Sequence, residues 1–597
     1  MLVCKGNPFL DSLGLLALVT FASRVTATGT SQLPTVDLGY AIHQATYNDL
    51  RNWFNFSNIH YASAPRFGAP APVTIVDRQI NDGQTPGICP LKLPTWFGLE
   101  TLYLSGQMSL EEVNSTYINL QNLSPSSDAS LINQYLVEPD PRVTEDCLTL
   151  DVVVPEKAWK RARDASGAAP VLVWLYGGGY TVGDKNYAGN PAGLIEKAQM
   201  DGSDGVVYVA INYRLGLFGF ASGPDYEEHG GVSNLGLRDQ RFALEWIQKN
   251  IHLFGGDPEN VTVLGESAGG GSILHQITAY GSTSRAPFKR AILQSPGLEP
   301  NVGTTKQSLR YNKALNWASY FSNSSVKTLK DLEQLPFDVV EKVNQMTVAT
   351  TNWGSFGWGP ETDGDFVPEP PGVLLSKGRF DSFVEVLTAH NSDEGSIFAS
   401  PLIESNEQFI SSLLKPLLPD APDKVIEYIA TELYPPMYDG TYLWTTPLER
   451  TSTVVAESWF ICNNYMLNKA LAGNAFNYLF DVAPGYHGND IPYTFFNNET
   501  SSAGGPLNAS IAYTLQAYLT NFALTGSPNG AGLPDIARYG AEKTVLSLYN
   551  RTQVVDMTAS ERCDWWQMTL HRYVDGYSAI TYDEGEERLL AIVDAVR

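Results

Sequence analysis

The chain has 597 residues, of which 43% are hydrophobic and 11% aromatic. A chain of this size and composition is typical of a globular protein that buries a large core without disulfide bonds, and large α/β enzymes often form one compact unit. The 39 Lys and Arg residues against 64 Asp and Glu residues give a formal net charge of −25. Because this charge repels phosphate backbones and anionic lipid, we expect no nucleic-acid partner.

The N-terminal residues have the pattern of an export signal. Lys5 is a basic start, residues 13–22 form a short apolar run, and residues 25–27 (Val-Thr-Ala) form a small-residue cleavage site. The run is too short to span a bilayer, and no later stretch reaches about 18 apolar residues. We therefore predict a signal peptide over 1–27 and a mature chain over 28–597, secreted to the outside, the cell wall or the vacuole. The alternative is a buried N-terminal helix.

Two further features fit export. Eight N-x-[S/T] sequons are candidate glycosylation sites, at Asn55, Asn114, Asn122, Asn260, Asn323, Asn498, Asn508 and Asn550. Because Cys4 would leave with the signal, four cysteines remain, and an even number in an oxidising compartment predicts two disulfide bonds with three possible pairings. They are Cys89, Cys147, Cys462 and Cys563. No Cys/His cluster has metal spacing, so we expect neither a metal nor a cofactor.

The first part of the mature chain predicts a sheet edge and a long excursion. Short strand-like runs alternate with loops over 34–78. The excursion runs from Cys89 to Cys147 with a helix expected over 110–120, and a loop of this length typically serves as a lid or a site wall. Tying its ends with a disulfide would stabilise the fold by roughly 4 kcal/mol in the chain-entropy model. Strand-like alternation resumes over 144–151.

The middle of the chain alternates strands with helices. Continuous apolar runs at 170–176 and 205–212 are typical of buried parallel strands. A helical pattern over 237–251 is followed by a strand at 261–264 and, after another helix, by a strand at 290–295. This repetition predicts an α/β fold with a large, mostly parallel central sheet flanked by helices.

The remaining elements continue the pattern without an internal repeat or a low-complexity linker. We therefore predict one catalytic domain. The expected elements are helices over 303–380 and 406–470, strands at 384–387 and 476–480, a helix over 512–524, a strand at 545–549 and a last helix after Cys563.

The run Gly265-Glu266-Ser267-Ala268-Gly269 follows a strand and precedes a helix. A serine hydroxyl becomes a useful nucleophile when a sharp strand-to-helix turn exposes it beside a base, and the glycines permit such a turn. The first free amides of the helix, including that of Ala268, would face an oxyanion forming at Ser267. The alternative is a Gly-rich turn with an incidental serine.

The base and the acid of a serine hydrolase must follow neighbouring strands. His390 and His487 both follow strands, and His487 gives the order serine, acid, histidine that this turn predicts. His275 is excluded as the base because eight residues of helix rise by about 12 Å. The acid is Asp393 or Glu394, which are adjacent, and the residues themselves do not separate the two.

A glycine triplet, Gly177-Gly178-Gly179, follows the strand at 170–176. Glycines let a substrate carbonyl approach the backbone closely and leave its amides unobstructed, so this turn can donate to an oxyanion. The alternative is an ordinary turn.

Motifs spread densely over 145–396, with further matches at His487 and 563–566, share the pattern of one family. They are Glu145-Asp146-Cys147-Leu148, Tyr176-Gly177-Gly178-Gly179-Tyr180, Asn212-Tyr213-Arg214, Asn234-Leu235-Gly236-Leu237-Arg238-Asp239-Gln240, Phe254-Gly255-Gly256-Asp257-Pro258, Gly265-Glu266-Ser267-Ala268-Gly269-Gly270, Ser392-Asp393-Glu394-Gly395-Ser396 and Cys563-Asp564-Trp565-Trp566. Together they resemble the type-B carboxylesterase/lipase family, the cholinesterase-like branch of the α/β-hydrolases, and its secreted fungal members most of all.

The resemblance implies an α/β-hydrolase fold and a site. It implies Glu394 rather than Asp393 as the acid, with Asp393 as a buried supporting charge. The other implied residues are Ser267 as nucleophile, His487 as base, and Gly178, Gly179 and Ala268 as oxyanion donors. The implied disulfide bonds are Cys89–Cys147 and Cys462–Cys563.

The resemblance also bears on the substrate pocket. It places Phe356 and Trp358 near an acyl pocket, and the alternative for both is packing in the core. The Cys89–Cys147 excursion is longer than in animal cholinesterases, so Trp96 is a candidate wall residue and no more.

The expected function is a secreted serine carboxylic-ester hydrolase that forms an acyl-enzyme on Ser267. Its partner would be a small-molecule or lipid ester, without cofactor, nucleic acid or integral membrane segment. One alternative passes the acyl group to an alcohol or amine, as a transacylase in small-molecule biosynthesis. The other is an adhesion or binding protein on an inactive hydrolase scaffold.

Overall fold

The computed structural model describes most of the chain. The described residues are 33–165, 167–300, 303–498, 508–557 and 560–574. The predicted signal peptide, 1–27, lies outside them.

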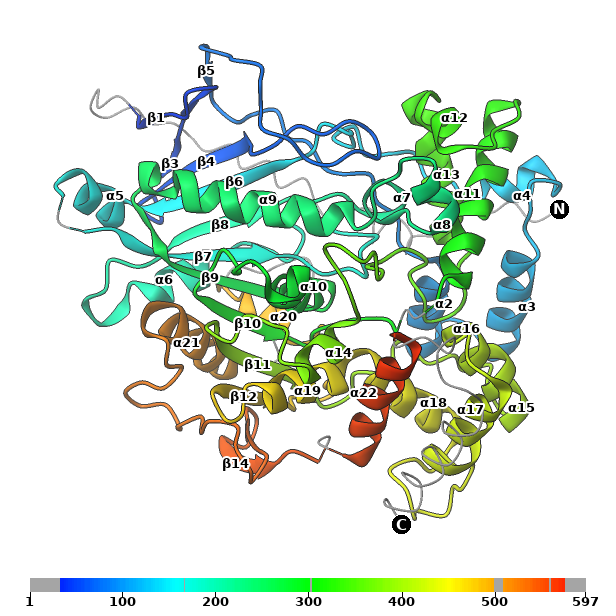
Figure 1. Cartoon of the computed structure of the whole chain (residues 1–597). Coiled ribbons are helices and arrows are strands. Elements are labelled where there is room, and N and C mark those ends of the chain that lie inside the picture. The colour runs from blue at the N-terminus through cyan, green and yellow to red at the C-terminus, as the bar shows by residue number, and fades with distance from the viewer. Residues whose placement is uncertain (1–32, 166, 301–302, 499–507, 558–559, 575–597) are drawn as a thin grey trace.

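An 11-stranded sheet forms the centre of the molecule (Figure 1). Its spatial order is β14 (Thr552–Val555), β13 (Thr544–Ser547), β12 (Ala475–Phe480), β11 (Glu385–Asn391), β10 (Arg290–Gln294), β9 (Gly256–Glu266), β7 (Ala169–Leu175), β8 (Val207–Ile211), β6 (Thr149–Pro155), β4 (Trp53–His60) and β3 (Thr46–Asn48). Neighbours from β13 to β8 are parallel, and antiparallel pairs finish both edges. The predicted mostly parallel sheet is confirmed.

The strand register brings three loops to one edge of the sheet. In β9, β10 and β11, Glu266 pairs with Gln294, which pairs with Ala389. β12 lies beside β11 with Phe480 opposite Asn391. Because carboxyl ends of parallel strands share an edge, the residues after β9, β11 and β12 meet there.

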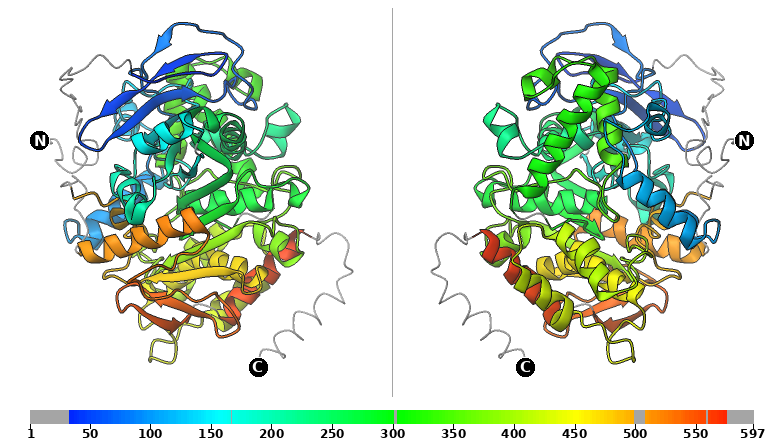
Figure 2. Two further views of the ribbon diagram at one scale, coloured as in Figure 1. Left: turned by 90° about the vertical axis from the view of Figure 1, so that its left-hand side faces the viewer. Right: turned by 90° about the vertical axis from the view of Figure 1, so that its right-hand side faces the viewer.

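Side chains of the strands alternate between two buried clusters, one on each face of the sheet. In β7, Val171 and Val173 belong to one cluster, and Leu172 and Trp174 belong to the other. The first cluster also contains apolar side chains of α9 (Leu235–Asn250) and α10 (Ala268–Thr278), and the second contains those of α6 (Ala192–Ala198) and α21 (Ala509–Thr525). The views along the strands in Figure 2 show α21 in orange on the side opposite the green helices. Each face is therefore covered by helices, as a parallel sheet requires.

The N-terminal strands are divided between two sheets. β3 and β4 form the edge of the large sheet, as predicted. β1 (Thr35–Asp37), β2 (Ile42–Gln44) and β5 (Ile80–Asn81) instead form a separate three-stranded sheet, so the expected single edge over 34–78 is only partly right.

The Cys89–Cys147 excursion contains three helices, and a disulfide bond joins its ends. Its helices are α2 (Thr95–Leu104), α3 (Leu110–Gln121) and α4 (Ala129–Asn133). α3 matches the expected helix and begins at a capping box in which Ser109 and Glu112 satisfy each other's backbone amides.

The remaining helices gather mostly beyond the carboxyl edge of the sheet, on the right of Figure 1. A second disulfide bond, Cys462–Cys563, joins α19 (Cys462–Ala470) to α22 (Glu561–Val574). The last helix was expected after Cys563 but begins at Glu561, so this cysteine lies within it. Among the described residues, no helix is long and apolar enough to cross a bilayer.

The bounds of the other helical segments complete the fold. The α-helices are α5 (Glu156–Arg163), α7 (Gly216–Phe220), α8 (Pro224–Glu228), α11 (Thr305–Ser322), α12 (Leu329–Glu333), α13 (Phe337–Ala349), α14 (Pro371–Ser376), α15 (Asn406–Gln408), α16 (Lys415–Leu417), α17 (Asp423–Tyr428), α18 (Pro447–Ala456) and α20 (Ile491–Thr494). Short 3₁₀ or π segments are Met200–Gly202, Ile251–Phe254, Ala279–Ser282, Phe409–Leu414, Ile429–Leu433 and Glu457–Ile461.

Candidate active site

Ser267 occupies the turn between β9 and α10. Its backbone has φ 57° and ψ −124°, a conformation that a non-glycine residue rarely adopts. The turn is held on both sides: the Ser267 amide donates to the Gln294 carbonyl at 3.0 Å, and its carbonyl accepts from Gly271 at 2.8 Å and Gly297 at 2.9 Å. Strain of this kind persists only where surrounding contacts fix it, and here it turns the hydroxyl out of the sheet.

Close packing explains the glycine two residues later. A Cβ atom on Gly269 would lie 2.0 Å from the carbonyl oxygen of Leu175 in β7. Any larger residue would therefore push α10 away from the sheet and shift the serine.

A hydrogen-bonded chain links the three expected side chains. The Oγ atom of Ser267 lies 2.8 Å from Nε2 of His487, and Nδ1 of His487 lies 2.5 Å from Oε2 of Glu394. The second carboxylate oxygen of Glu394 accepts from the Asn391 amide at 2.6 Å. The Glu394 side chain is fully buried, so this charge is held in a fixed direction.

The loops after β11 and β12 are tied to each other, which positions the acid and the base. The Asp393 amide donates to the Gly485 carbonyl at 2.9 Å. The Asn391 side chain donates to the Tyr486 carbonyl at 2.8 Å. The His487 ring packs against Phe460, with centroids 4.2 Å apart, and against Phe398 at 5.2 Å.

Neighbouring buried charges shift the pKa values of His487 and Glu394. Burial disfavours the imidazolium form of His487, but the nearby carboxylates of Glu394 and then Glu266 outweigh burial and raise the pKa of His487 above its ordinary value. Burial likewise disfavours ionised Glu394, but His487 outweighs it and lowers the pKa of this carboxyl. Both shifts favour an imidazolium–carboxylate pair.

Two further carboxyls surround the histidine, and neither was found from the sequence. Glu266 Oε1 lies 3.4 Å from Nε2 of His487, and burial raises the pKa of Glu266 to about 8. Asp490 accepts from the Gln294 amide at 2.9 Å, and burial raises its pKa to about 7. Glu266 directly precedes the serine and Asp490 follows the histidine by three residues, which was the only sequence signal for them. The sequence does not show where their side chains point.

The structure resolves two alternatives. Asp393 was expected to be a buried supporting charge, but it is only half-buried. Its carboxylate accepts two hydrogen bonds from Ser396 and so holds the loop after β11. His390 lies inside β11, where Nδ1 contacts Asn464 at 3.3 Å and Nε2 lies 3.9 Å from Asp556. His390 was expected to follow a strand but lies within one, and of the two candidate histidines only His487 contacts the serine. Among the described residues, no group of three or more His, Cys, Asp or Glu is arranged to hold a metal ion.

The glycine triplet lies against the serine. A Cβ atom on Gly177 would lie 2.9 Å from Cβ of Ser267, and Gly178 and Gly179 have φ values of 110° and 59°. A Cβ atom on Gly179 would lie 2.1 Å from the ring of Phe356. Within the described part of the chain, no backbone carbonyl accepts the Gly178 or Gly179 amide. The Ala268 amide is likewise free as part of the first turn of α10.

A cavity opens beside Ser267. Two expected pocket residues, Phe356 and Trp358, line it, but the candidate wall residue Trp96 does not. Trp96 is fully buried behind the wall, with its ring 5.8 Å from that of Phe356 and its Nε1 donating to the Ser355 carbonyl at 2.7 Å. The lining residues are Gly179, Tyr180, Ser267, Ala268, His275, Gly297, Leu298, Glu299, Pro300, Phe356, Trp358, Gly359, Pro360, Glu361, Thr362, Val367, Pro370, Pro371, Gly372, Ser458, Trp459, Phe460 and Asn463.

One wall of the cavity, the segment 356–362, is anchored by helices α9 and α11. At the start of α9, Asn234 donates to the Glu361 carbonyl at 2.7 Å and accepts from the Glu361 amide at 2.9 Å. From α11, Gln307 and Arg310 donate to the Glu361 carboxylate at 2.6 and 3.0 Å. The wall is therefore fixed independently of any substrate.

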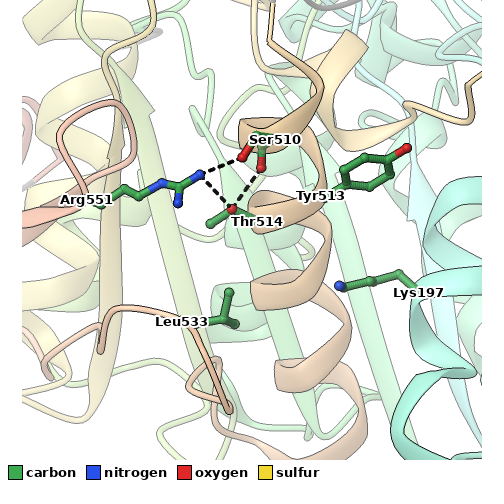
Figure 3. A pocket seen from close by; sticks show the side chains of 6 residues that line it. All are labelled: Lys197, Ser510, Tyr513, Thr514, Leu533 and Arg551. Carbon is green, nitrogen blue, oxygen red and sulfur yellow. Dashed lines mark hydrogen bonds between the residues drawn. The ribbon is translucent and has the colours of Figure 1, made fainter.

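A second hollow lies away from the serine, between α6 and α21 (Figure 3). There Arg551 donates to the Ser510 hydroxyl at 2.8 Å. Neither a histidine nor a carboxylate is present among the described residues that line it, so the cavity at Ser267 is the candidate active site. The lining residues are Lys197, Ser510, Tyr513, Thr514, Leu533 and Arg551.

The eight sequons differ in accessibility. Asn55 lies within β4, paired on both sides, and its Oδ1 is buried without a partner among the described residues. Asn260 lies within β9 and accepts a hydrogen bond from Arg290. The other six asparagines, all exposed, are Asn114, Asn122, Asn323, Asn498, Asn508 and Asn550.

Comparisons with known proteins agree along most of the chain. The model of a family described as the carboxylesterase family matches residues 44–566. Carboxylesterase patB of Penicillium expansum is 36% identical over 564 residues, which cover 92% of this chain and 98% of that protein. Secreted lipase ARB07186/07185 of Arthroderma benhamiae is 31% identical over 372 residues, covering 60% of this chain and 64% of the lipase. The crystal structure of Aspergillus niger EstA matches with a TM-score of 0.72 at 22% identity, covering 92% of this chain and 100% of that one, a likeness of fold.

Proposed function

This chain belongs to the carboxylesterase family and is a carboxylic-ester hydrolase, and we propose that it works through a Ser267–His487–Glu394 triad and an acyl-enzyme. The observation that carries the proposal is the chain of two short contacts, 2.8 Å from serine to imidazole and 2.5 Å from imidazole to carboxylate. This order of hydroxyl, imidazole and carboxylate is the arrangement that activates a serine for acyl transfer.

The reaction proceeds in two halves. Nε2 of His487 takes the proton of the Ser267 hydroxyl as Oγ bonds to the ester carbonyl carbon. The resulting oxyanion accepts hydrogen bonds from the amides of Gly178, Gly179 and Ala268. His487 then gives its proton to the leaving alcohol, and the acyl group remains on Oγ. Water, deprotonated by His487, attacks this acyl-enzyme, and the acid is released as the proton returns to Ser267.

Glu394 has a positioning and electrostatic role in this scheme. Its contact with Nδ1 keeps the proton on that nitrogen, so that Nε2 is free to accept the serine proton. Because the carboxylate is buried and ionised, it stabilises the imidazolium that forms in each half-reaction.

The proposal extends to the setting of the enzyme. We place residues 28–597 outside the cell as one catalytic domain that acts on small ester substrates. The two disulfide bonds and the similarity to a secreted lipase support an oxidising, extracellular setting. N-glycans would be carried by the exposed sequons, since Asn55 and Asn260 lie within paired strands.

Labelling with a fluorophosphonate, followed by assays on p-nitrophenyl esters, tests the proposal. The wild-type chain should react with the probe and hydrolyse esters, whereas Ser267→Ala should lose labelling and about four or more powers of ten in turnover. Ser272→Ala is the matched control, because this serine is buried five residues further along α10, where its hydroxyl contacts Gln240 and Tyr180 and not His487.

Two results would contradict the proposal. An unlabelled, folded wild-type chain would indicate an inactive scaffold. If the Ser267→Ala variant keeps near wild-type turnover, Ser267 is not the nucleophile. Analysis of the products with an added alcohol or amine separates hydrolysis from acyl transfer.

A further inference from the structure

Three glycosylation sequons border the second hollow, between α6 and α21. Asn508 is the N-cap of α21, and the first two turns of this helix line the hollow. Asn550 directly precedes Arg551, and Asn498 accepts a hydrogen bond from the Tyr513 hydroxyl at 2.6 Å. Arg551 and Tyr513 both line the hollow. Three of the six exposed sequons therefore gather around one depression, and the carboxamide of Asn498 contacts its aromatic side chain.

The contact with Tyr513 fixes where a sugar on Asn498 would start. An N-glycan is attached to Nδ2, whereas the hydrogen bond from Tyr513 uses Oδ1, so the two are compatible. Because both atoms are bonded to the same carbon, a sugar on Nδ2 begins beside the Tyr513 hydroxyl. The Asn498 backbone has φ 63°, a left-handed conformation that asparagine tolerates, and the residue is exposed at a bend of the chain.

Tyr513 offers an aromatic surface at this point. The residue is 41% exposed, and its ring packs on Phe496 with centroids 5.5 Å apart. Phe496 lies two residues before Asn498, so both rings belong to the immediate surroundings of the sequon. The face of an aromatic ring carries negative partial charge and attracts the C–H groups on one face of a sugar ring. A sugar on Asn498 would therefore bury apolar surface of Tyr513.

The hollow supplies room and a hydrogen-bond donor. Its volume is about 300 Å³, at the lower end of the range of small-ligand pockets. Figure 3 shows Lys197 of α6 and Tyr513 of α21 on the same side of α21, with Arg551 on the other side. The Lys197 side chain lines the hollow, and its ammonium can donate to the hydroxyl or acetamido oxygens of a sugar.

We propose that Asn498 carries an N-glycan whose first sugar packs on the ring of Tyr513 at the edge of the second hollow. The packed sugar joins two segments, since Asn498 follows α20 and Tyr513 lies in α21. The inference goes beyond the proposed hydrolase mechanism and does not depend on the triad.

The modification is a transfer from a lipid-diphosphate-linked oligosaccharide to the Asn498 side chain. The bond from C1 of the first sugar to the phosphate oxygen breaks, and a C1–Nδ2 bond forms. Nδ2 loses one proton as the lipid diphosphate leaves. Because N-glycans are added in the secretory pathway, the inference rests on the proposed extracellular setting.

The test measures how fast each glycan is removed from the folded chain after secretion by a yeast host. Peptide N-glycosidase F must reach the first sugar and leaves aspartate in place of asparagine, so mass spectrometry of peptides gives a release rate for each sequon. The glycan at Asn498 should be released about threefold to tenfold more slowly than that at Asn122, the effect of one aromatic contact. Asn122, the exposed C-cap of α3, is the matched control site.

Two substitutions of Tyr513 separate the ring from its hydroxyl. Tyr513→Ala should raise the release rate at Asn498 to that at Asn122, whereas Tyr513→Phe, which keeps the ring, should leave release slow. Tyr549→Ala is the matched control variant, because Tyr549 is 61% exposed and likewise lies beside a sequon asparagine, Asn550. It should leave the rate at Asn498 unchanged.

Thermal unfolding provides a second measurement, which does not depend on access by an enzyme. Asn498→Asp removes the sequon, and aspartate keeps an oxygen acceptor for the Tyr513 hydroxyl and tolerates the same φ. Tyr513→Ala should lower the melting temperature more in the glycosylated chain than in the Asn498→Asp background.

The outcomes separate the packed sugar from the proposals that precede it. Glycans at other sequons with none at Asn498, or equal release at Asn498 and Asn122, would overturn the packed sugar and leave the extracellular setting intact. Slow release that persists in a folded Tyr513→Ala variant, or an equal thermal effect of this substitution in both backgrounds, would also overturn it. A chain that carries no N-glycan at any sequon would contradict the setting, and the packed sugar with it. Ester hydrolysis is assayed separately, and its absence would contradict the triad alone.

Discussion

Replacing Glu394 by Gln removes one charge from the centre of the site and keeps the side-chain volume. The carboxylate contacts Nδ1 of His487 at 2.5 Å and has no solvent exposure. Opposite charges centred about 4 Å apart interact by about 4 kcal/mol at an effective dielectric constant of about 20. Losing that stabilisation of the imidazolium corresponds to about three powers of ten in rate. A glutamine amide that donates to Nδ1 would also favour the wrong tautomer, so we expect kcat to fall by three to four powers of ten.

The neighbouring carboxylate provides the control. Asp393 is half-buried, and its oxygens accept from Ser396 rather than from the imidazole. Asp393→Asn removes the same charge one residue away, and kcat should stay within about tenfold of wild type. The measurement is burst and steady-state hydrolysis of a p-nitrophenyl ester, with circular dichroism to verify that both variants are folded.

The reversed result would refute this reasoning. If Asp393→Asn is crippled and Glu394→Gln is nearly as fast as wild type, the acid has been assigned to the wrong residue. If both variants are fast, the buried carboxylate does not stabilise the imidazolium during turnover.

Three other perturbations follow from the geometry. Gly179→Ala places a methyl group 2.1 Å from the ring of Phe356 at a φ of 59°. Because this displaces one oxyanion donor, kcat should fall by about two to three powers of ten, while the fluorophosphonate should still label Ser267. In the kcat/KM–pH profile, the midpoint of the acidic limb should lie above about pH 6.5, because the pKa of His487 is raised and activity is lost as pH falls through it. A midpoint below about pH 6 would contradict the influence of the buried Glu394 and Glu266 carboxylates on His487. Arg214→Met leaves a fully buried aspartate of α9 without its partner and should cost about 3–5 kcal/mol of unfolding free energy in urea titrations, whereas Arg78→Met, at an exposed ion pair, should cause no measurable change.

The positions of Ser267 and His487, the proposed nucleophile and base, were predictable because local patterns determine where the two residues lie. A buried strand, a small-residue turn and a helix fix where Ser267 lies, and the strand at 475–480 fixes the loop that holds His487. Chain order then selects among the histidines. The mostly parallel sheet follows from the same alternation of apolar runs and helices.

Periodicity could not separate Asp393 from Glu394 as the candidate acid, for a physical reason. β11 continues to Asn391, whereas its strand character was expected over 384–387. Past the end of a strand, adjacent side chains no longer alternate regularly, so neither Asp393 nor Glu394 could be directed toward the histidine from spacing. The contact between this loop and Gly485 settles the orientation, and that contact is tertiary.

Contacts between distant segments also determine the positions of the residues that the sequence did not predict. Nothing near Trp96 in sequence shows that Phe356 lies between it and the cavity. His275 lines the cavity, and its place there depends on where the loop after β10 and the segment before β11 run. Such placements follow from packing and not from spacing.

The anchoring of segment 356–362 has a consequence for engineering. Its hydrogen bonds run to Asn234 at the start of α9 and to Gln307 and Arg310 of α11. The segment is therefore held by residues that lie outside it. Libraries that vary Phe356 and Trp358 while retaining these anchors would reshape the acyl cavity without loosening the chain that holds it. Libraries that randomise Glu361 would remove the carboxylate that Gln307 and Arg310 bind and would loosen this wall of the cavity.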